Sequence, residues 1–114
     1  MVTIKYKESK SGFRVDLEGH ANSPYSKIGE DGVCSAISIL TTTLARSVAD
    51  AEHAGMLTDK AVINLGEDGE GYGRVSCRVD RKYHATMRLL YGQIINGYML
   101  MAHNYPNEVS FIRN

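Results

Sequence analysis

The sequence predicts an α+β fold, a two-layer sandwich in which about five mostly antiparallel strands carry two helices packed on one face. Short segments alternate apolar and polar residues, which indicates strands covered on one side only. Two longer segments repeat apolar residues at spacings of three and four, which is typical of amphipathic helices. These segments follow the order β-β-α-β-β-α-β, and the 114 residues suffice for a single domain over 1–114 with one core.

Two strands open the predicted fold. Residues 2–7 (VTIKYK) place apolar side chains at every second position, and residues 13–19 repeat this pattern. The connector over residues 8–12 is short and ends in glycine, which suits a hairpin. We therefore expect the two segments to pair as antiparallel neighbours.

The first helix is predicted from Gly32 to about His53. Its apolar stripe faces the expected core, and Gly55 is placed to end the helix as a C′ residue. The residues of the stripe are Ile37, Leu40, Leu44, Val48 and Ala51.

The second half repeats the pattern of two strands and a helix. Alternation predicts strands over 61–65 and 75–79, joined by a glycine-rich turn over 66–73, and places Cys77 on the inner face. A helix is expected over 81–104, with Asp80 as its cap and Pro106 just beyond its end. The stripe expected for this helix is Met87, Leu90, Ile94, Tyr98 and Met101, and a last short strand holds Val109 and Phe111.

Composition and charge argue against several classes of function. Lys plus Arg and Asp plus Glu both total 13, so the net charge is zero and no basic excess favours nucleic acid. No long uninterrupted apolar segment or signal-peptide core is present, which favours a cytoplasmic protein without a membrane contact. The four histidines and two cysteines form no zinc-binding spacing, and a disulfide is not expected.

The segment between the second strand and the first helix carries the candidate chemistry. It is a polar loop that begins after Gly19 and His20 and reaches the helix start at Asp31 and Cys34. Asp31 is a good N-cap, and a thiol in the first helical turn lies where the helix dipole lowers its pKa. Peptide N–H groups of that turn can also receive a developing oxyanion. If the loop folds back, the imidazole of His20 reaches the thiol of Cys34, the minimum pair for cysteine nucleophilic catalysis.

Each of these residues also has an ordinary interpretation. A lone cysteine is more often a small buried hydrophobe, and His20 alone would be a polar residue at a strand end. Ser38 shares a helix face with Cys34, but a helical serine often bonds to its own backbone. The other histidines, His53, His84 and His103, are expected to be solvated. These alternatives stay open on the residues alone.

The motifs as a set resemble the ribosomal-processing cysteine protease Prp family. The resemblance rests on Gly19-His20-Ala21, the polar loop, and Asp31–Ser38 (DGVCSAIS), with NYPNEV at 104–109 similar to the closing segment of the family. It implies that His20 and Cys34 form the catalytic dyad, and that Gly19, Asp31 and Ser38 support it. It also implies a homodimer that removes a short N-terminal extension from a large-subunit ribosomal protein, or from a related phage protein. Gly32 and Ser35 depart from the usual pattern.

The resulting hypothesis is a cysteine endopeptidase that needs no metal or organic cofactor. In the loop over 22–30, Tyr25 and Ile28 are the sizeable apolar groups expected to contact the peptide, and Gly29 is the expected hinge. The expected partner is the N-terminal extension of a ribosomal protein, with no direct nucleic-acid contact. The alternative is a non-catalytic, ribosome- or phage-associated module that binds a peptide with the same fold.

Overall fold

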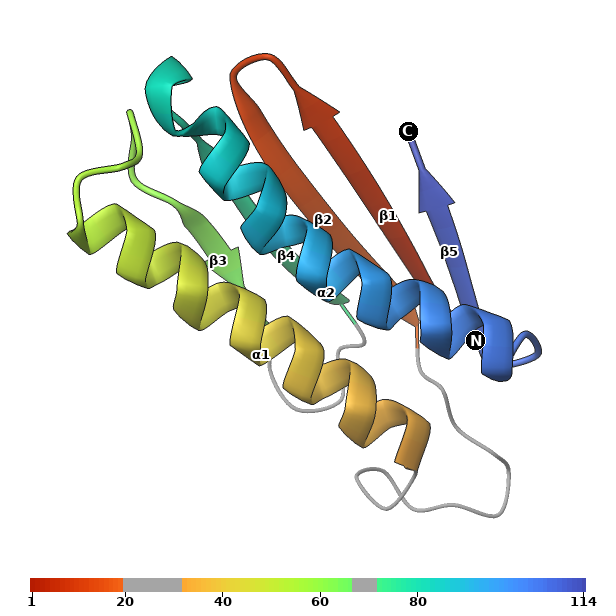
Figure 1. Ribbon diagram of the computed structural model, residues 1–114. Coiled ribbons are helices and arrows are strands. Elements are labelled where there is room, and N and C mark those ends of the chain that lie inside the picture. The colour runs from red at the N-terminus through yellow and green to blue at the C-terminus, as the bar shows by residue number, and fades with distance from the viewer. Residues whose placement is uncertain (20–31, 67–71) are drawn as a thin grey trace.

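A five-stranded sheet carries two long helices on one face in the computed structural model of the chain (Figure 1), which describes residues 1–19, 32–66 and 72–114. The fold class and the order of elements predicted from the sequence are confirmed. The elements are β1 (Val2–Ser9), β2 (Gly12–Gly19), α1 (Gly32–His53), β3 (Val62–Asn64), β4 (Tyr72–Arg78), the 3₁₀ turn η1 (Arg81–Tyr83), α2 (His84–Asn104) and β5 (Val109–Arg113).

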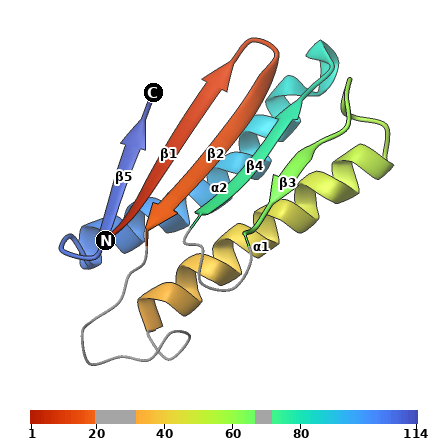
Figure 2. The same cartoon turned by 180° about the vertical axis from the view of Figure 1, so that it is seen from behind.

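The strands lie in the order β3-β4-β2-β1-β5. All neighbours are antiparallel except β1 and β5, which are parallel. Figure 2 shows the sheet from the side opposite the helices, where no helix covers it. The sheet therefore has one face in the core and one open face, which explains the strict alternation in β1, β2 and β4.

The β1–β2 hairpin is tighter than the sequence predicted. Ser9 pairs with Gly12, so only Lys10 and Ser11 form the turn, and both strands extend beyond the predicted bounds. A Cβ atom on Gly12 would lie 2.3 Å from the carbonyl oxygen of Cys77 in β4. Glycine is required here because the hairpin and β4 approach too closely for a side chain.

Helix α1 has the predicted bounds and the predicted stop. Gly55 adopts a φ of 77°, and its N–H donates to the carbonyl of Glu52 at 3.0 Å. The N–H of Met56 donates to the carbonyl of Ala51 at 3.0 Å. This pair of bonds is a Schellman motif, which satisfies two carbonyls that the helix itself leaves open.

The length and apolar composition of α1 would allow it to cross a membrane, although the sequence predicted no membrane contact. In the fold, however, α1 buries a stripe against the sheet and α2, as the core helix of a two-layer sandwich does. Its buried residues are Val33, Ile37, Thr41, Leu44, Ala45, Val48 and Ala51.

The second helical segment begins with η1 and continues as α2. The carboxylate of Asp80 accepts a hydrogen bond from the N–H of Lys82 at 3.1 Å, which confirms the predicted cap. The buried face of α2 is wider than the predicted stripe, since Tyr91 and Ile95 are also buried, while Leu90 and Met101 are only partly so.

His84 is less solvated than expected, since its side chain is only partly exposed. Its ring packs against Phe13 with the ring centroids 4.8 Å apart. Its Nε2 lies 2.8 Å from the carbonyl oxygen of Ser9, to which it donates because a carbonyl only accepts. His84 therefore fastens the start of α2 to the β1–β2 hairpin. His53 and His103 are exposed, as expected.

The third strand is shorter and more exposed than predicted. It spans only Val62–Asn64, and Ile63 and Leu65, expected to face the core, are 38% and 45% exposed. The reason is that β3 is an edge strand, paired on one side with β4 only. Of the predicted glycine-rich turn, Tyr72 and Gly73 belong to β4, whereas residues 67–71 lie outside the described residues.

Candidate active site

Cys34 is the third residue of α1, and its side chain is partly buried against the core. The N-terminal end of α1 lies at the same end of the molecule as Gly19, the last residue of β2 (Figures 1 and 2). The positive end of the helix dipole lies in this first turn. The thiol is thus held at a helix start with part of its surface open to solvent.

Gly19 is a position that only glycine can occupy. Its φ is 93°, and a Cβ atom placed on it would lie 2.1 Å from the carbonyl oxygen of Met1. Any side chain here would force β1 and β2 apart at the end where the chain leaves the sheet. His20 follows Gly19 directly in the sequence. The structure gives Gly19 a role in strand pairing, and the supporting role expected for it in the chemistry stays a prediction.

Ser38 lies one helical turn after Cys34 and is exposed. Residues four apart share a helix face, so Ser38 and Cys34 belong to the same side of α1. This places the hydroxyl in the neighbourhood of the thiol, on the solvent side. A part for Ser38 in the chemistry stays a prediction.

Several predicted site residues fall on segments outside the described residues. They are His20 of the dyad, the expected N-cap Asp31, and the loop residues Tyr25, Ile28 and Gly29. The pairing of His20 with Cys34, the cap and the peptide contacts therefore stay predictions.

Cys77 has an environment opposite to that of Cys34. It lies in β4 on the core face and is only 5% exposed, which confirms the predicted inward orientation. Burial raises the pKa of its thiol, because the low-dielectric interior disfavours the thiolate. The two cysteines therefore differ in exposure, since Cys34 is partly exposed and Cys77 is buried.

Sequence reasoning missed the residue that anchors α1 on the inside. Thr41, seven positions after Cys34, is buried and is hydrogen-bonded to Tyr98 of α2. A threonine in line with the apolar stripe, four residues after Ile37, is the signal that points to it. No group of three metal-binding side chains occurs within residues 1–19, 32–66 and 72–114.

Comparisons with known proteins point to one family. The family described as "Cysteine protease Prp" matches residues 1–110 of the chain. The ribosomal processing protease Prp from S. aureus, in complex with a covalently linked product peptide, superposes with a TM-score of 0.74 at 17% identity and 100% coverage of both chains. The same S. aureus protease in complex with a substrate peptide gives a TM-score of 0.70 at 14% identity, again with 100% coverage of both chains.

A third structure is SMU.848 from Streptococcus mutans, with a TM-score of 0.68 at 23% identity, covering 100% of this chain and 96% of the other. No curated protein matches the sequence. At these identities the structural likeness establishes a shared fold. The match to the family over residues 1–110 includes the candidate motifs at Gly19–Ala21 and Asp31–Ser38.

Proposed function

The chain belongs to the cysteine protease Prp family, and on that premise we propose that it is a cysteine endopeptidase acting through Cys34 and His20. The observation that carries the proposal is the placement of Cys34 in the first turn of α1, partly exposed, at the end of the molecule where Gly19 leads into His20. A thiol retained only for packing would resemble Cys77, which is buried in the sheet.

The proposed reaction begins when the imidazole of His20 accepts the proton of the Cys34 thiol. The thiolate sulfur attacks the scissile carbonyl carbon, and the dipole of α1 stabilises the negative charge that develops beside it. The carbon–nitrogen bond then breaks, and the His20 imidazolium protonates the leaving amine. Water attacks the resulting thioester, His20 accepts its proton, and hydrolysis releases the new carboxylate and regenerates the thiol.

The proposed substrate is the N-terminal extension of a large-subunit ribosomal protein or of a related phage protein. The support is the family, together with the S. aureus relative, which is described as a ribosomal processing protease bound to substrate and product peptides. We place the reaction in the cytoplasm, where such a substrate is made. Tyr25 and Ile28 are proposed to contact the peptide, with Gly29 as the hinge of their loop.

We also propose that the protein acts as a homodimer. The outward faces of both helices carry large exposed apolar side chains, among them Ile39, Leu89 and Leu100 at 67%, 73% and 61% exposure. Such side chains on a monomer favour contact with another protein surface. Light scattering coupled to size exclusion tests the dimer, and a monomeric mass at micromolar concentration contradicts it.

The test of the activity uses intact mass spectrometry of ribosomal proteins that carry N-terminal extensions. We expect the wild-type chain to remove a short N-terminal piece, and Cys34→Ser and His20→Ala to leave the substrate whole. Cys77→Ser is the matched control, since this thiol lies in the core, and it is expected to cleave like wild type. If a substrate binds but none is cleaved, the chain is a peptide-binding module of the same fold.

A further inference from the structure

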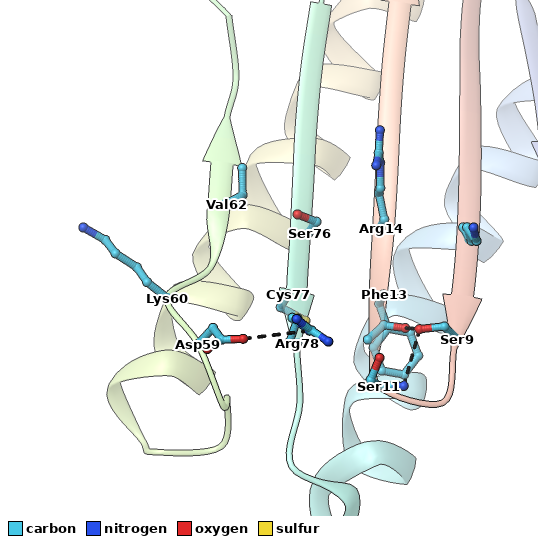
Figure 3. A pocket seen from close by; sticks show the side chains of 12 residues that line it. Ser9, Ser11, Phe13, Arg14, Asp59, Lys60, Val62, Ser76, Cys77 and Arg78 are labelled. Carbon is cyan, nitrogen blue, oxygen red and sulfur yellow. Dashed lines mark hydrogen bonds and ion pairs between the residues drawn. The ribbon is translucent and has the colours of Figure 1, made fainter.

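The open face of the sheet contains a hollow of about 530 Å³ at the end where β1 and β2 join (Figure 3). This hollow is rimmed by four cationic side chains and one acid. The cations are Lys7, Arg14, Lys60 and Arg78, and the acid is Asp59. The hollow lies on the uncovered side of the sheet, and the start of α1 with Cys34 lies at the other end of the molecule (Figures 1 and 2).

The strand register explains why the charge gathers at this end. Lys7, Arg14 and Ser76 are cross-strand neighbours in one row, and Ser9, Gly12 and Arg78 form the next row towards the hairpin. Neither row contains an acid. Side chains at paired positions share a face, so these cations lie together on the open side. The zero net charge of the whole chain conceals this local excess.

The acids near the hollow neutralise only part of this charge. Asp59 lies 3.8 Å from Arg78, with the two side chains 61% and 69% exposed, and a pair so exposed is weak. Asp16 bonds both Arg14 and Arg74, so one carboxylate faces two guanidinium groups. Among the described residues, Lys7 and Lys60 form no ion pair.

Without a bound anion, the cross-strand pair of Lys7 and Arg14 lowers the stability of the fold. Like charges placed directly opposite each other on antiparallel strands destabilise the pairing. A polyanion in the hollow would offset this repulsion, because it attracts both cations. Three serines, Ser9, Ser11 and Ser76, add hydroxyl groups to the same lining. Lysine, arginine and serine are the side chains that hold phosphate oxygens in nucleic-acid complexes.

We propose that this hollow binds single-stranded nucleic acid through its phosphate backbone. The cations and serines that line the hollow can contact several phosphates of a flexible strand at once. The lining offers no aromatic stacking platform apart from Phe13, which packs in the core, so the contact is with phosphates and carries no base preference. The proposal does not depend on protease activity, because the hollow and Cys34 lie at opposite ends.

The test is fluorescence anisotropy with a labelled 12-nucleotide uridine RNA between 25 and 200 mM KCl. Lys7→Gln/Lys60→Gln removes two cations of the hollow. Arg46→Gln/Lys82→Gln removes two exposed cations outside it, so both variants have the same net charge. We expect the hollow variant to bind about tenfold more weakly at 50 mM salt, with the log–log salt slope smaller by about 1.4. The control is expected to stay within threefold of wild type.

Two further measurements separate RNA binding by the hollow from an effect on stability and from protease activity. Lys7→Gln is expected to raise the thermal midpoint while it weakens RNA binding, because it removes a like-charge pair; a structural lysine would lower the midpoint. Cys34→Ser is expected to bind RNA like wild type whether or not the chain is a protease.

Absence of RNA binding at 25 mM salt overturns the proposal, as does an equal loss in both double variants. Competition by a poly-glutamate peptide at the same charge concentration, as strong as that by unlabelled RNA, overturns it in favour of an acidic protein partner. Equal competition by millimolar inorganic phosphate overturns it in favour of a small anion. DNA of the same length is expected to compete about as well as RNA.

Discussion

The hydroxyl oxygen of Tyr98 lies 2.6 Å from Oγ1 of Thr41, in the buried layer between α1 and α2. Thr41 uses its own proton to bond the carbonyl of Ile37 at 2.8 Å, so Tyr98 is the donor to Thr41. Thr41 is the one polar or charged side chain other than tyrosine that is buried in the described part of the chain. The bond joins the helix that carries Cys34 to its neighbour two turns beyond the thiol.

This bond predicts an asymmetry between its two partners. Thr41→Val leaves the buried Tyr98 hydroxyl without its acceptor and is expected to cost about 1–3 kcal/mol of unfolding free energy. Tyr98→Phe leaves the Thr41 proton bonded to Ile37 and is expected to cost about 1 kcal/mol. Urea unfolding of the two variants and of the double variant measures both costs and their coupling. A larger cost for Tyr98→Phe would contradict this account of the bond.

Burial of Tyr98 also predicts a loss of stability in alkali. Burial raises the pKa of the Tyr98 phenol to about 12 from its ordinary value of 10.0. The folded state thus holds the phenol proton where the unfolded state releases it, so the contribution is complete below pH 10 and is lost as pH rises towards 12. The free energy of unfolding is expected to fall by about 2–3 kcal/mol by pH 12 because of Tyr98. Urea unfolding between pH 9 and 12 is expected to show a shallower decline for Tyr98→Phe, with the exposed Tyr105→Phe as control.

The alternation of residues predicted β1, β2 and β4 because each has one covered face and neighbours on both sides. It failed for β3, where Ile63 is apolar but lies on an edge strand that little else covers. The helical stripe predicted for α2 was narrower than its buried face. Tyr91 and Ile95 were missed because α2 contacts both the sheet and α1, which widens the buried arc beyond one stripe.

The candidate site was only partly predictable. The position of Cys34 follows from the helix start, which the sequence marks with Gly32 and the apolar stripe that begins beyond it. The requirement for glycine at position 19 was invisible, because it arises from the carbonyl of Met1 on the paired strand. The cationic hollow was invisible for a similar reason, since Lys7 and Arg14 become neighbours only through the register.

Gly19→Ala is expected to destabilise the fold and to lower peptidase activity together. The substitution places a methyl group 2.1 Å from the carbonyl oxygen of Met1 at a φ of 93°, so the end of β2 must shift. We expect the free energy of unfolding to fall by about 1–3 kcal/mol, which is measured as a lower thermal midpoint. Gly92→Ala is the matched control: nothing lies within 4 Å of its new Cβ, and it is expected to stabilise α2 by about 0.5–1 kcal/mol.

Substitutions at Asp31 separate capping from charge. If Asp31 is the N-cap that the sequence predicts, Asp31→Ala is expected to lose about 1 kcal/mol of stability and most of the proposed peptidase activity, because the first turn that holds Cys34 would lose its cap. Asp31→Asn still caps and is expected to retain most of both. Thermal melts followed by circular dichroism, together with cleavage rates, separate the capping role of Asp31 from the role of its charge. An Asn variant as inactive as the Ala variant would assign the effect to the carboxylate charge.

The two thiols are expected to differ in reactivity near neutral pH. Cys34 lies partly exposed in the first turn of α1, whereas burial raises the pKa of the Cys77 thiol in the core. Since the thiolate is the nucleophile, iodoacetamide at pH 7 is expected to alkylate Cys34 at least tenfold faster than Cys77. Peptide mass mapping over time gives both rates in one sample, so Cys77 is the internal control. If His20 withdraws the thiol proton, His20→Ala slows the alkylation of Cys34 and leaves that of Cys77 unchanged. Equal slow rates at both thiols in the wild-type chain would contradict an activated Cys34.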